Sequence, residues 1–318
     1  MSASSLLMIS DGKDFWGTDD ISRHSQIATI GRAGEIQERY EDLSHLANKR
    51  VLVLVHGFNN TEEEIVPHYF NIVDKLNQIA RKDSSPFYDV IIGYHAPLFD
   101  SRLEYFQAQN HCKLLAPRVR GHLDQLALQA NTVDVVAHSM GNRLIFEALS
   151  SFGRRKVTPI NHMFSLAAAV DDEALDRGEI YSSCLKRCRE VSILFSRNDG
   201  VLKGLYPLAE FDSALGTAGS EDVSKLPSNS KQVDCTSLID SHSAYLTALP
   251  VFYFIRNTLL GKIPSPQTTQ TLELLSDGSV KILQKPSMPD LTTIVKAGAV
   301  AVAFVFGIWG IYRKAYGI

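Results

Sequence analysis

The stretch VDVVAHSMGNRL, residues 133–144, carries the pattern that decides the fold. An apolar run leads into a serine, and a helix-like pattern follows it. Small residues stand two positions before and two positions after Ser139, at Ala137 and Gly141. A sharp strand-to-helix turn needs such residues because the strand, the turn and the helix approach closely there. The stretch therefore predicts that Ser139 is a nucleophile at the tip of a tight turn, with an ordinary turn serine as the alternative.

Apolar runs and helix patterns alternate on both sides of this turn. Residues 51–55 form a continuous apolar run, which is typical of a strand buried on both faces of a sheet. Thr61 and Glu64 then match a capping box at the start of a helix, within which Pro67 predicts a delay or a kink. Further strand-like runs follow in FYDVIIGYHAP, HMFSLAAAV, EVSILFS and KQVDCTSL. This alternation predicts an α/β fold, an α/β-hydrolase-type mainly parallel sheet with helices on both faces.

Three segments do not follow the simple alternation. Residues 102–130 are long enough for one or two helices, with Pro117 and Gly121 as expected interruptions. Residues 216–231, rich in Gly, Ser and charge, are expected to form a surface excursion. The stretch TLELLSDGSVKIL predicts a small hairpin that turns at Asp277-Gly278.

The changes in composition predict four parts of the chain. These are an N-terminal extension with the first strands (1–49), an α/β-hydrolase catalytic domain (50–262), a linker with the hairpin (263–290) and an expected transmembrane anchor with a short basic tail (291–318).

The last part contains an apolar segment, residues 294–312, in which Lys296 is the only charge. A bilayer core is crossed by about 20 such residues, so we expect a single transmembrane helix. The alternative is a buried C-terminal helix of a soluble fold. Without a signal peptide, the expected orientation leaves the catalytic domain in the cytosol, although Arg313 and Lys314 favour the opposite one.

A nucleophilic serine needs a histidine to accept its proton and an acid to orient that histidine. In the chain order Ser, acid, His, Asp199 follows the run EVSILF and His242 follows the run KQVDCTSL. Asp171 and Asp172, which follow the preceding run, are alternative acids or helix caps. Three other histidines, His56, His95 and His138, also lie near expected strand ends. Only His242 lies after every candidate acid in the chain.

The oxyanion of a tetrahedral intermediate needs two hydrogen-bond donors. The backbone N–H after the nucleophile belongs to Met140, and the loop VHGFNN offers that of Phe58. Gly57 allows the backbone to approach closely there. The alternative is a loop glycine beside a core aromatic.

Composition limits the partners. The net charge is −3 and no dense basic block precedes the last residues, so nucleic-acid binding is not expected. The four cysteines include a CLKRC spacing but lack further ligands for a metal site, so we expect buried reduced thiols, no metal and no cofactor. Small acyl or lipid molecules are the expected substrates, and no pattern indicates an oligomeric state.

The segments VLVLVHGFNN, AHSMGNRL, SRNDGVL and HSAY, in that order, resemble the bacterial α/β-hydrolases grouped as domain of unknown function 900, relatives of esterases and lipases. The resemblance covers about residues 50–261. It implies a serine-hydrolase fold and assigns Ser139, Asp199 and His242 as nucleophile, acid and base, with the Phe58 and Met140 amides as oxyanion donors. Members often carry a proline before the acid near AAAVDD, where this chain has alanine and valine.

The sequence thus predicts a membrane-tethered serine hydrolase that cleaves carboxylic esters through an acyl-enzyme. Two other functions remain as alternatives. One is an anchored interaction module with a hydrolase fold and no turnover, because a fold does not dictate function. The other is a serine peptidase, which would cleave peptides rather than acyl esters.

Overall fold

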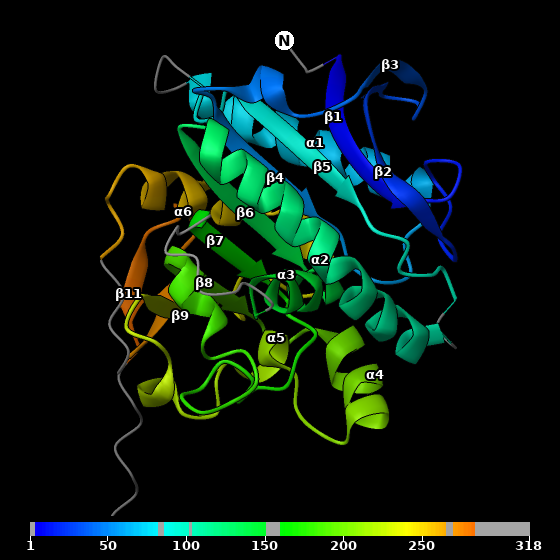
Figure 1. The fold of residues 1–318 in the computed structure, drawn as a ribbon. Helices are drawn as coiled ribbons and strands as arrows, with labels where there is room; N and C mark the ends of the chain where they lie inside the picture. Colours follow the sequence, from blue (N-terminus) through cyan, green and yellow to red (C-terminus); the bar gives the residue numbers. More distant parts are fainter. Residues whose placement is uncertain (1–3, 82–85, 102–103, 151–159, 265–269, 284–318) are drawn as a thin grey trace, which may run out of the picture. The chain divides into compact units, whose positions relative to one another are not determined.

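A single eleven-stranded sheet organises the computed structural model, which describes residues 4–81, 86–101, 104–150, 160–264 and 270–283 (Figure 1). The strands lie side by side in the order β11-β10-β9-β8-β7-β6-β4-β5-β1-β2-β3. Their bounds are β1 (Ser5–Gly12), β2 (Ile21–Gly31), β3 (Ile36–Tyr40), β4 (Arg50–Val55), β5 (Val90–His95), β6 (Thr132–His138), β7 (Ile160–Leu166), β8 (Cys188–Phe195), β9 (Ser230–Asp234), β10 (Thr271–Leu274) and β11 (Val280–Ile282).

The central strands from β10 to β1 are parallel, and among the described strands antiparallel pairs occur only where β2, β3 and β11 join the sheet. In β4 every residue after Arg50 is buried, as expected of a strand covered on both faces. The sheet confirms the predicted α/β fold with mainly parallel strands.

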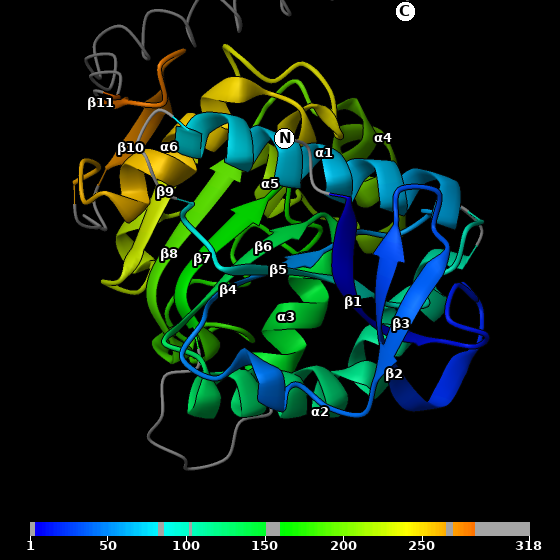
Figure 2. The same cartoon turned by 90° about the horizontal axis from the view of Figure 1, so that it is seen from above.

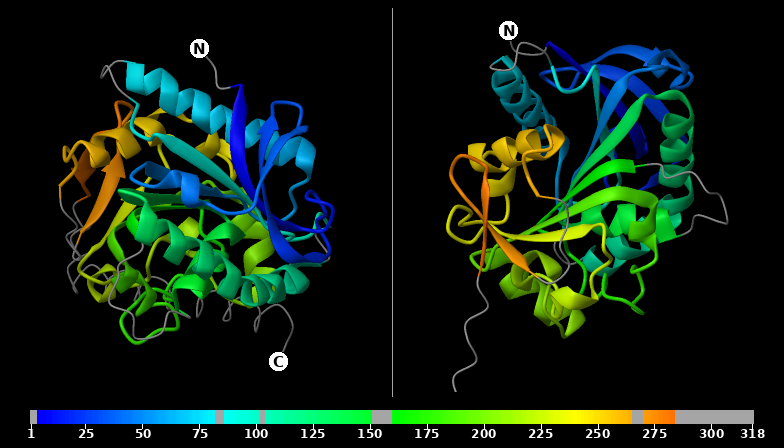
Figure 3. Two further views of the ribbon diagram at one scale, coloured as in Figure 1. Left: turned by 45° about the horizontal axis from the view of Figure 1, so that its top comes forward. Right: turned by 90° about the vertical axis from the view of Figure 1, so that its left-hand side faces the viewer.

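Helices cover both faces of the sheet. Helices α1 and α6 lie on one face, and α2 and α3 lie on the other (Figures 2 and 3). The helices are α1 (Glu62–Ala80), α2 (Tyr105–Gln129), α3 (Met140–Ser150), α4 (Gly200–Glu210), α5 (Leu215–Ala218) and α6 (Leu249–Leu259).

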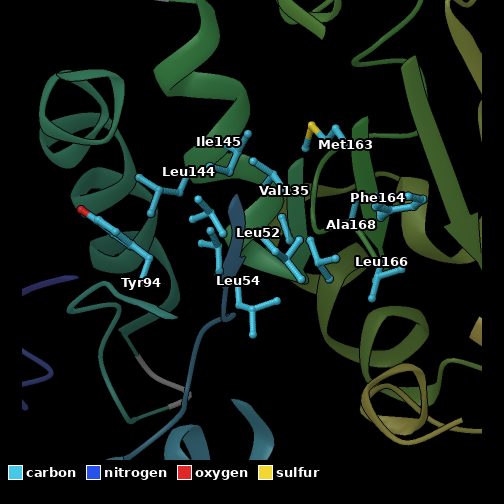
Figure 4. Close-up of a cluster of buried hydrophobic side chains, with 14 of the residues drawn as sticks. Leu52, Leu54, Tyr94, Val135, Leu144, Ile145, Met163, Phe164, Leu166 and Ala168 are labelled. Atoms are coloured by element: carbon cyan, nitrogen blue, oxygen red, sulfur yellow. The ribbon is translucent and has the colours of Figure 1, made fainter. Parts of the chain in front are cut away.

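The core lies where α3 packs on the central strands (Figure 4). Leu144 and Ile145 of α3 are fully buried beside residues of β4 and β6, such as Leu52 and Val135. Burying each such side chain stabilises the fold by about 1.5–3 kcal/mol. This packing fixes the start of α3, and with it the turn that holds Ser139.

Three expectations from the sequence differ from the structure. Pro117 and Gly121 do not interrupt α2, which runs through both, because buried residues of this helix offset the hydrogen bond that proline removes. The segment from residue 216 is not a surface excursion at its start, since α5 is buried there. The hairpin turns at Gly278 as expected, but β10 pairs with β9 and so extends the sheet rather than lying in a linker.

The predicted membrane segment, residues 294–312, lies outside the described residues. Within the part of the chain that the structure describes, no helix has both the length and the apolar character needed to span a bilayer.

Candidate active site

The candidate site lies at the carboxyl ends of β4 and β6, where the strand order reverses. The chain continues from β4 to β5 on one side, and β6 lies on the other side. Ligands of open α/β sheets bind at such switch points, because the loops diverge there and leave a crevice. Val55 of β4 is in register with Ala137 of β6, so the loop carrying Gly57 and the turn carrying Ser139 emerge next to each other.

Ser139 occupies the turn between β6 and α3 with φ of 55°. Such left-handed conformations cost non-glycine residues about 1–3 kcal/mol and persist only where the surroundings enforce them. Backbone bonds hold this one: Ser139 N–H donates to Leu166 (3.0 Å), and Ser139 C=O accepts from Asn142 and Ala169 (3.0 and 3.3 Å). The strained turn presents the serine side chain at the end of the sheet, as a nucleophile requires.

Two neighbours shape this turn. A Cβ atom on Gly141 would lie 2.4 Å from the His56 carbonyl oxygen, so the loop after β4 packs directly on α3 there. The buried Asn142 side chain donates to the carbonyl groups of Ala137, Ser139 and Leu166 at 3.0–3.2 Å. These contacts explain why the positions around Ser139 carry small or amide side chains.

Asp199 and His242 form a hydrogen-bonded pair, with 2.7 Å between Asp199 Oδ2 and His242 Nδ1. Asp199 is fully buried, and its Oδ1 accepts from the N–H groups of Val201 and Leu202 as the N-cap of α4 (3.1 and 3.0 Å). The helix N-terminus stabilises the carboxylate charge. One carboxylate thus caps α4 and orients the imidazole.

The alternative acids have other partners. Asp171 Oδ1 accepts a hydrogen bond from Tyr206 (2.7 Å). Burial, and then the neighbouring Glu173 and Asp212, raise the pKa of Asp172 to about 7. Ligand atoms of these three acids lie within 4.8 Å of one another and could approach a cation, although exposed acidic clusters are common without one. Neither Asp171 nor Asp172 is hydrogen-bonded to His242 in the described part of the chain.

Ser139 and His242 are both present at this end of the sheet, but among the described residues no hydrogen bond joins Ser139 Oγ to His242. Contacts with His138 fix the position of the loop that carries His242. The His138 and His242 rings are 4.7 Å apart, and His138 Nε2 donates to the His242 carbonyl oxygen at 2.8 Å. Since His138 directly precedes the serine, this bond ties the histidine loop to the turn.

Three further histidines around the site are buried and neutral. Burial lowers the pKa of His138 to about 3, and that of His56 to about 3, with the neighbouring histidines adding to the effect. Burial also lowers the pKa of His95 to about 4. The His56 and His95 rings stack at 5.3 Å, and His56 Nδ1 donates to Gly57 C=O (2.7 Å). These histidines therefore shape the loops around His242 in the uncharged form.

These lowered pKa values predict that acid destabilises the protein. In the unfolded chain the histidines take up protons near pH 6.5, whereas the folded protein keeps them neutral until about pH 3–4. Between these two pH values the unfolded state binds more protons than the folded state. The free energy of unfolding should therefore fall as the pH drops, by up to about 1.4 kcal/mol per pH unit for each histidine. Urea titrations from pH 7 to 4 measure the slope. His138→Gln should reduce it and the exposed His24→Gln should not; identical slopes in all three proteins would contradict the prediction.

The predicted oxyanion donors lie on the two loops at the switch point. Met140 is the first residue of α3, and Phe58 lies in the loop after β4, where the Asn60 side chain donates to the Phe58 carbonyl oxygen at 2.8 Å. Among the described residues, neither the Phe58 nor the Met140 N–H donates to an acceptor. First-turn N–H groups of a helix lack intrahelical partners, so the N–H of the buried Met140 has no acceptor of its own within α3.

Gly57 has no room for a side chain. A Cβ atom there would lie 2.6 Å from Ser139 Cβ and 3.1 Å from its Oγ. We expect Gly57→Ala to lower kcat/KM by about 100-fold, because displacing a nucleophile by about 1 Å costs this much. Ester-hydrolysis kinetics test this against Gly121→Ala, where nothing lies within 4 Å of the added Cβ. Equal activity of the two variants would contradict the close contact.

Neither the role of Asn142 nor the bond from His138 to His242 is predicted from the sequence. Both are polar residues within a run that otherwise packs into the core, and a polar residue in a buried position needs hydrogen-bond partners. That rule marks them as noteworthy, but their partners at Leu166 and His242 are set by the fold.

Comparisons with known proteins identify a family whose model matches most of the described domain. The model of one family, described as alpha/beta hydrolase of unknown function (DUF900), matches residues 33–237. No curated protein sequence matches the chain.

Among solved structures, Est1E from Butyrivibrio proteoclasticus is similar at 14% sequence identity and a TM-score of 0.38, with 70% of this chain and 91% of that chain covered. Phospholipase PlaB from Legionella pneumophila in complex with thio-NAD shares 17% identity at a TM-score of 0.26, with 39% of this chain covered. The match spans only 26% of the length of PlaB.

Proposed function

The chain belongs to the family of α/β-hydrolases of unknown function (DUF900), and we propose that it is a serine hydrolase that cleaves carboxylic esters through an acyl-enzyme. The observation that carries the proposal is the strained turn of Ser139, with φ of 55°, at the same sheet edge as the 2.7 Å Asp199–His242 pair. A nucleophile, a base and an orienting acid that follow parallel strands of one sheet form the constellation of acyl transfer.

In the proposed acylation step, Ser139 Oγ attacks the ester carbonyl carbon while His242 Nε2 accepts its proton. The Asp199 carboxylate accepts the Nδ1–H of His242, which fixes the tautomer with a free lone pair on Nε2 and stabilises the imidazolium. The N–H groups of Phe58 and Met140 stabilise the oxyanion. The intermediate collapses, the C–O bond to the alcohol breaks, and His242 protonates the leaving alkoxide.

In the deacylation step, His242 accepts a proton from water, and the resulting nucleophile attacks the acyl carbon. Collapse breaks the bond to Ser139 Oγ, which takes the proton back from His242, and the carboxylic acid leaves. The Ser139–His242 hydrogen bond must form for either step. Catalytic hydrogen bonds are often long without substrate and tighten when it binds.

We further propose that residues 294–312 tether the enzyme to a membrane, with the catalytic domain on the cytosolic side. The support is the sequence alone, an apolar run with one charge and a length near that of a bilayer span. A tether raises the local concentration of membrane-borne acyl esters at the domain. Lipid or acyl esters are therefore the substrate class that we propose.

An active-site-directed fluorophosphonate tests the serine hydrolase. Attack by an activated serine expels fluoride and leaves a stable Oγ–P bond, so mass spectrometry of a digest should locate the label on Ser139. Denatured protein is the control, because its serines are not activated. Absence of any activated serine would overturn the proposal and would support the interaction module without turnover.

A further inference from the structure

Helix α4 carries its polar and apolar residues in an unusual arrangement. On the inner side, Tyr206 is buried and donates to Asp171 (2.7 Å), while Glu210 accepts from Gln109 of α2 and lies 3.5 Å from Arg143 of α3. The outer side carries Val201, Leu205 and Leu208, which are one helical stripe because they follow the spacing i, i+4, i+7. On a helix that faces water, these exposed positions are expected to carry polar residues.

The stripe continues beyond the helix at Phe211. This side chain is 93% exposed and its backbone is left-handed, with φ of 60° at the C-cap of α4. Glycine is the residue that adopts this conformation without strain. An aromatic residue here both strains the backbone and exposes apolar surface to water. Neither feature stabilises the isolated domain, so we look to a ligand for its role.

Phe106 extends the surface onto α2. It is exposed and lies one turn before Gln109, whose side chain reaches Glu210 at the end of α4. We define the α4 patch by five residues, namely Phe106, Val201, Leu205, Leu208 and Phe211. The other exposed large apolar side chains of the described residues lie on β3, β11, α2 and separate loops. Single residues of that kind are common, whereas four of them on one helix and its C-cap mark an interaction surface.

The α4 patch adjoins the candidate site on two sides. Helix α4 starts directly after Asp199, which caps it. Phe106 is next to Tyr105, whose ring packs edge to face on Phe58 at 5.6 Å. Whatever covers the α4 patch therefore lies beside the loops that hold the acid and one oxyanion donor.

We propose that the α4 patch docks on the surface of a phospholipid bilayer and that the substrate ester enters the site from that bilayer; this rests on the proposed function. Amphipathic surfaces bind membranes by burying large apolar side chains at the boundary of headgroups and acyl chains. The chain itself points to this occupant. Its remaining residues include the apolar run 294–312, and the eleven residues from 283 to 293 span at most roughly 40 Å, which keeps the domain close to a membrane.

A fluorophore at Leu208 reads the docking directly. The four native cysteines are buried, and burial raises the pKa of each thiol, so a new surface cysteine can be labelled selectively. Leu208→Cys is compared with Leu128→Cys, since the two leucines are similarly exposed (77% and 71%). Leu128 lies outside the α4 patch, at the end of α2 opposite to Phe106. The full chain is studied with phosphatidylcholine–phosphatidylglycerol vesicles that contain lipid-borne nitroxide quenchers.

We expect quenching at Leu208→Cys to exceed that at Leu128→Cys at least twofold. Equal quenching at both sites, or none at either, overturns the docking surface. A change at Leu208→Cys that follows protein concentration without vesicles overturns it in favour of a second copy of the chain. This readout needs no catalysis, so it is independent of whether Ser139 is reactive.

Phe211→Gly connects the docking to turnover. Glycine adopts φ of 60° without strain, so the variant should fold and unfold at a temperature at least as high as the wild type. For an ester embedded in vesicles we expect kcat/KM to fall about tenfold, while a water-soluble short-chain ester is hydrolysed at the wild-type rate. Equal loss on both esters, or no loss on the vesicle ester, contradicts the role of the patch. Wild type inactive on the soluble ester would instead overturn the proposed function.

Discussion

Ser139→Ala is expected to lower kcat for ester hydrolysis by roughly 10⁴- to 10⁶-fold. Without Oγ no acyl-enzyme forms, and the Phe58 and Met140 amides can polarise the carbonyl only for direct attack by water. Folding should change little, because alanine keeps the backbone bond from residue 139 to Leu166 (3.0 Å) and the left-handed turn. Steady-state kinetics on a soluble chromogenic ester and a thermal melt measure the two effects.

Ser165→Ala provides the matched control. Ser165 is a fully buried serine of β7, in register with Ala137, and its hydroxyl has no partner in the described structure. Losing that hydroxyl should leave kcat unchanged. A Ser139→Ala protein that hydrolyses esters as fast as Ser165→Ala would rule out the serine mechanism. An anchored module without turnover would then explain the fold better.

The parts of the fold that depend on local patterns could be predicted from sequence. The apolar run of β4 and the amphipathic pattern of α3 determine their structures through burial, because each pattern matches only one period. The capping box at Thr61 is likewise local, and Glu64 Oε2 accepts from the Thr61 N–H at 3.0 Å. The interruption expected at Pro117 was wrong, because helix propensity does not include the tertiary packing that buries one side of α2.

The candidate site combines local and distant information. The turn at Ser139 and its neighbouring small residues are a local signal. The order of Asp199 and His242 along the chain indicated their roles, but their 2.7 Å contact joins residues 43 positions apart. The His138–His242 bond spans 104 positions, and no pattern of residues near either partner encodes such a contact. Loop geometry of this kind follows only from the assembled sheet.

Local pattern and distant contacts also give different answers for α4. Its sequence has an apolar stripe, and such a stripe alone predicts the face that packs on the core. In the structure Leu202 and Tyr206 face inward and the stripe with Leu208 faces outward. The capping bond of Asp199 and the Tyr206–Asp171 bond set this rotation. Polar contacts from other segments thus decide which side of the helix is exposed.

Asp199→Asn is expected to lower kcat by about 10⁴-fold, as the loss of a carboxylate that orients the base does in serine hydrolases. Asparagine is a good N-cap, so the bonds to the Val201 and Leu202 N–H groups can persist and the stability loss should stay near about 1 kcal/mol. The amide nitrogen then faces His242 Nδ1. That contact favours the tautomer with a proton on Nε2, which cannot accept the proton of Ser139.

Asp171→Asn is the variant that separates the two candidate acids. Its amide oxygen can still accept the hydrogen bond of Tyr206, now at 2.7 Å from Asp171 Oδ1, so α4 should remain in place and kcat should stay within about threefold of wild type. Kinetics on one soluble ester, with thermal melts of both variants, give the comparison. A larger loss in Asp171→Asn than in Asp199→Asn would transfer the role of the acid to Asp171. The 2.7 Å bond between Asp199 and His242 would then serve only to position the loop.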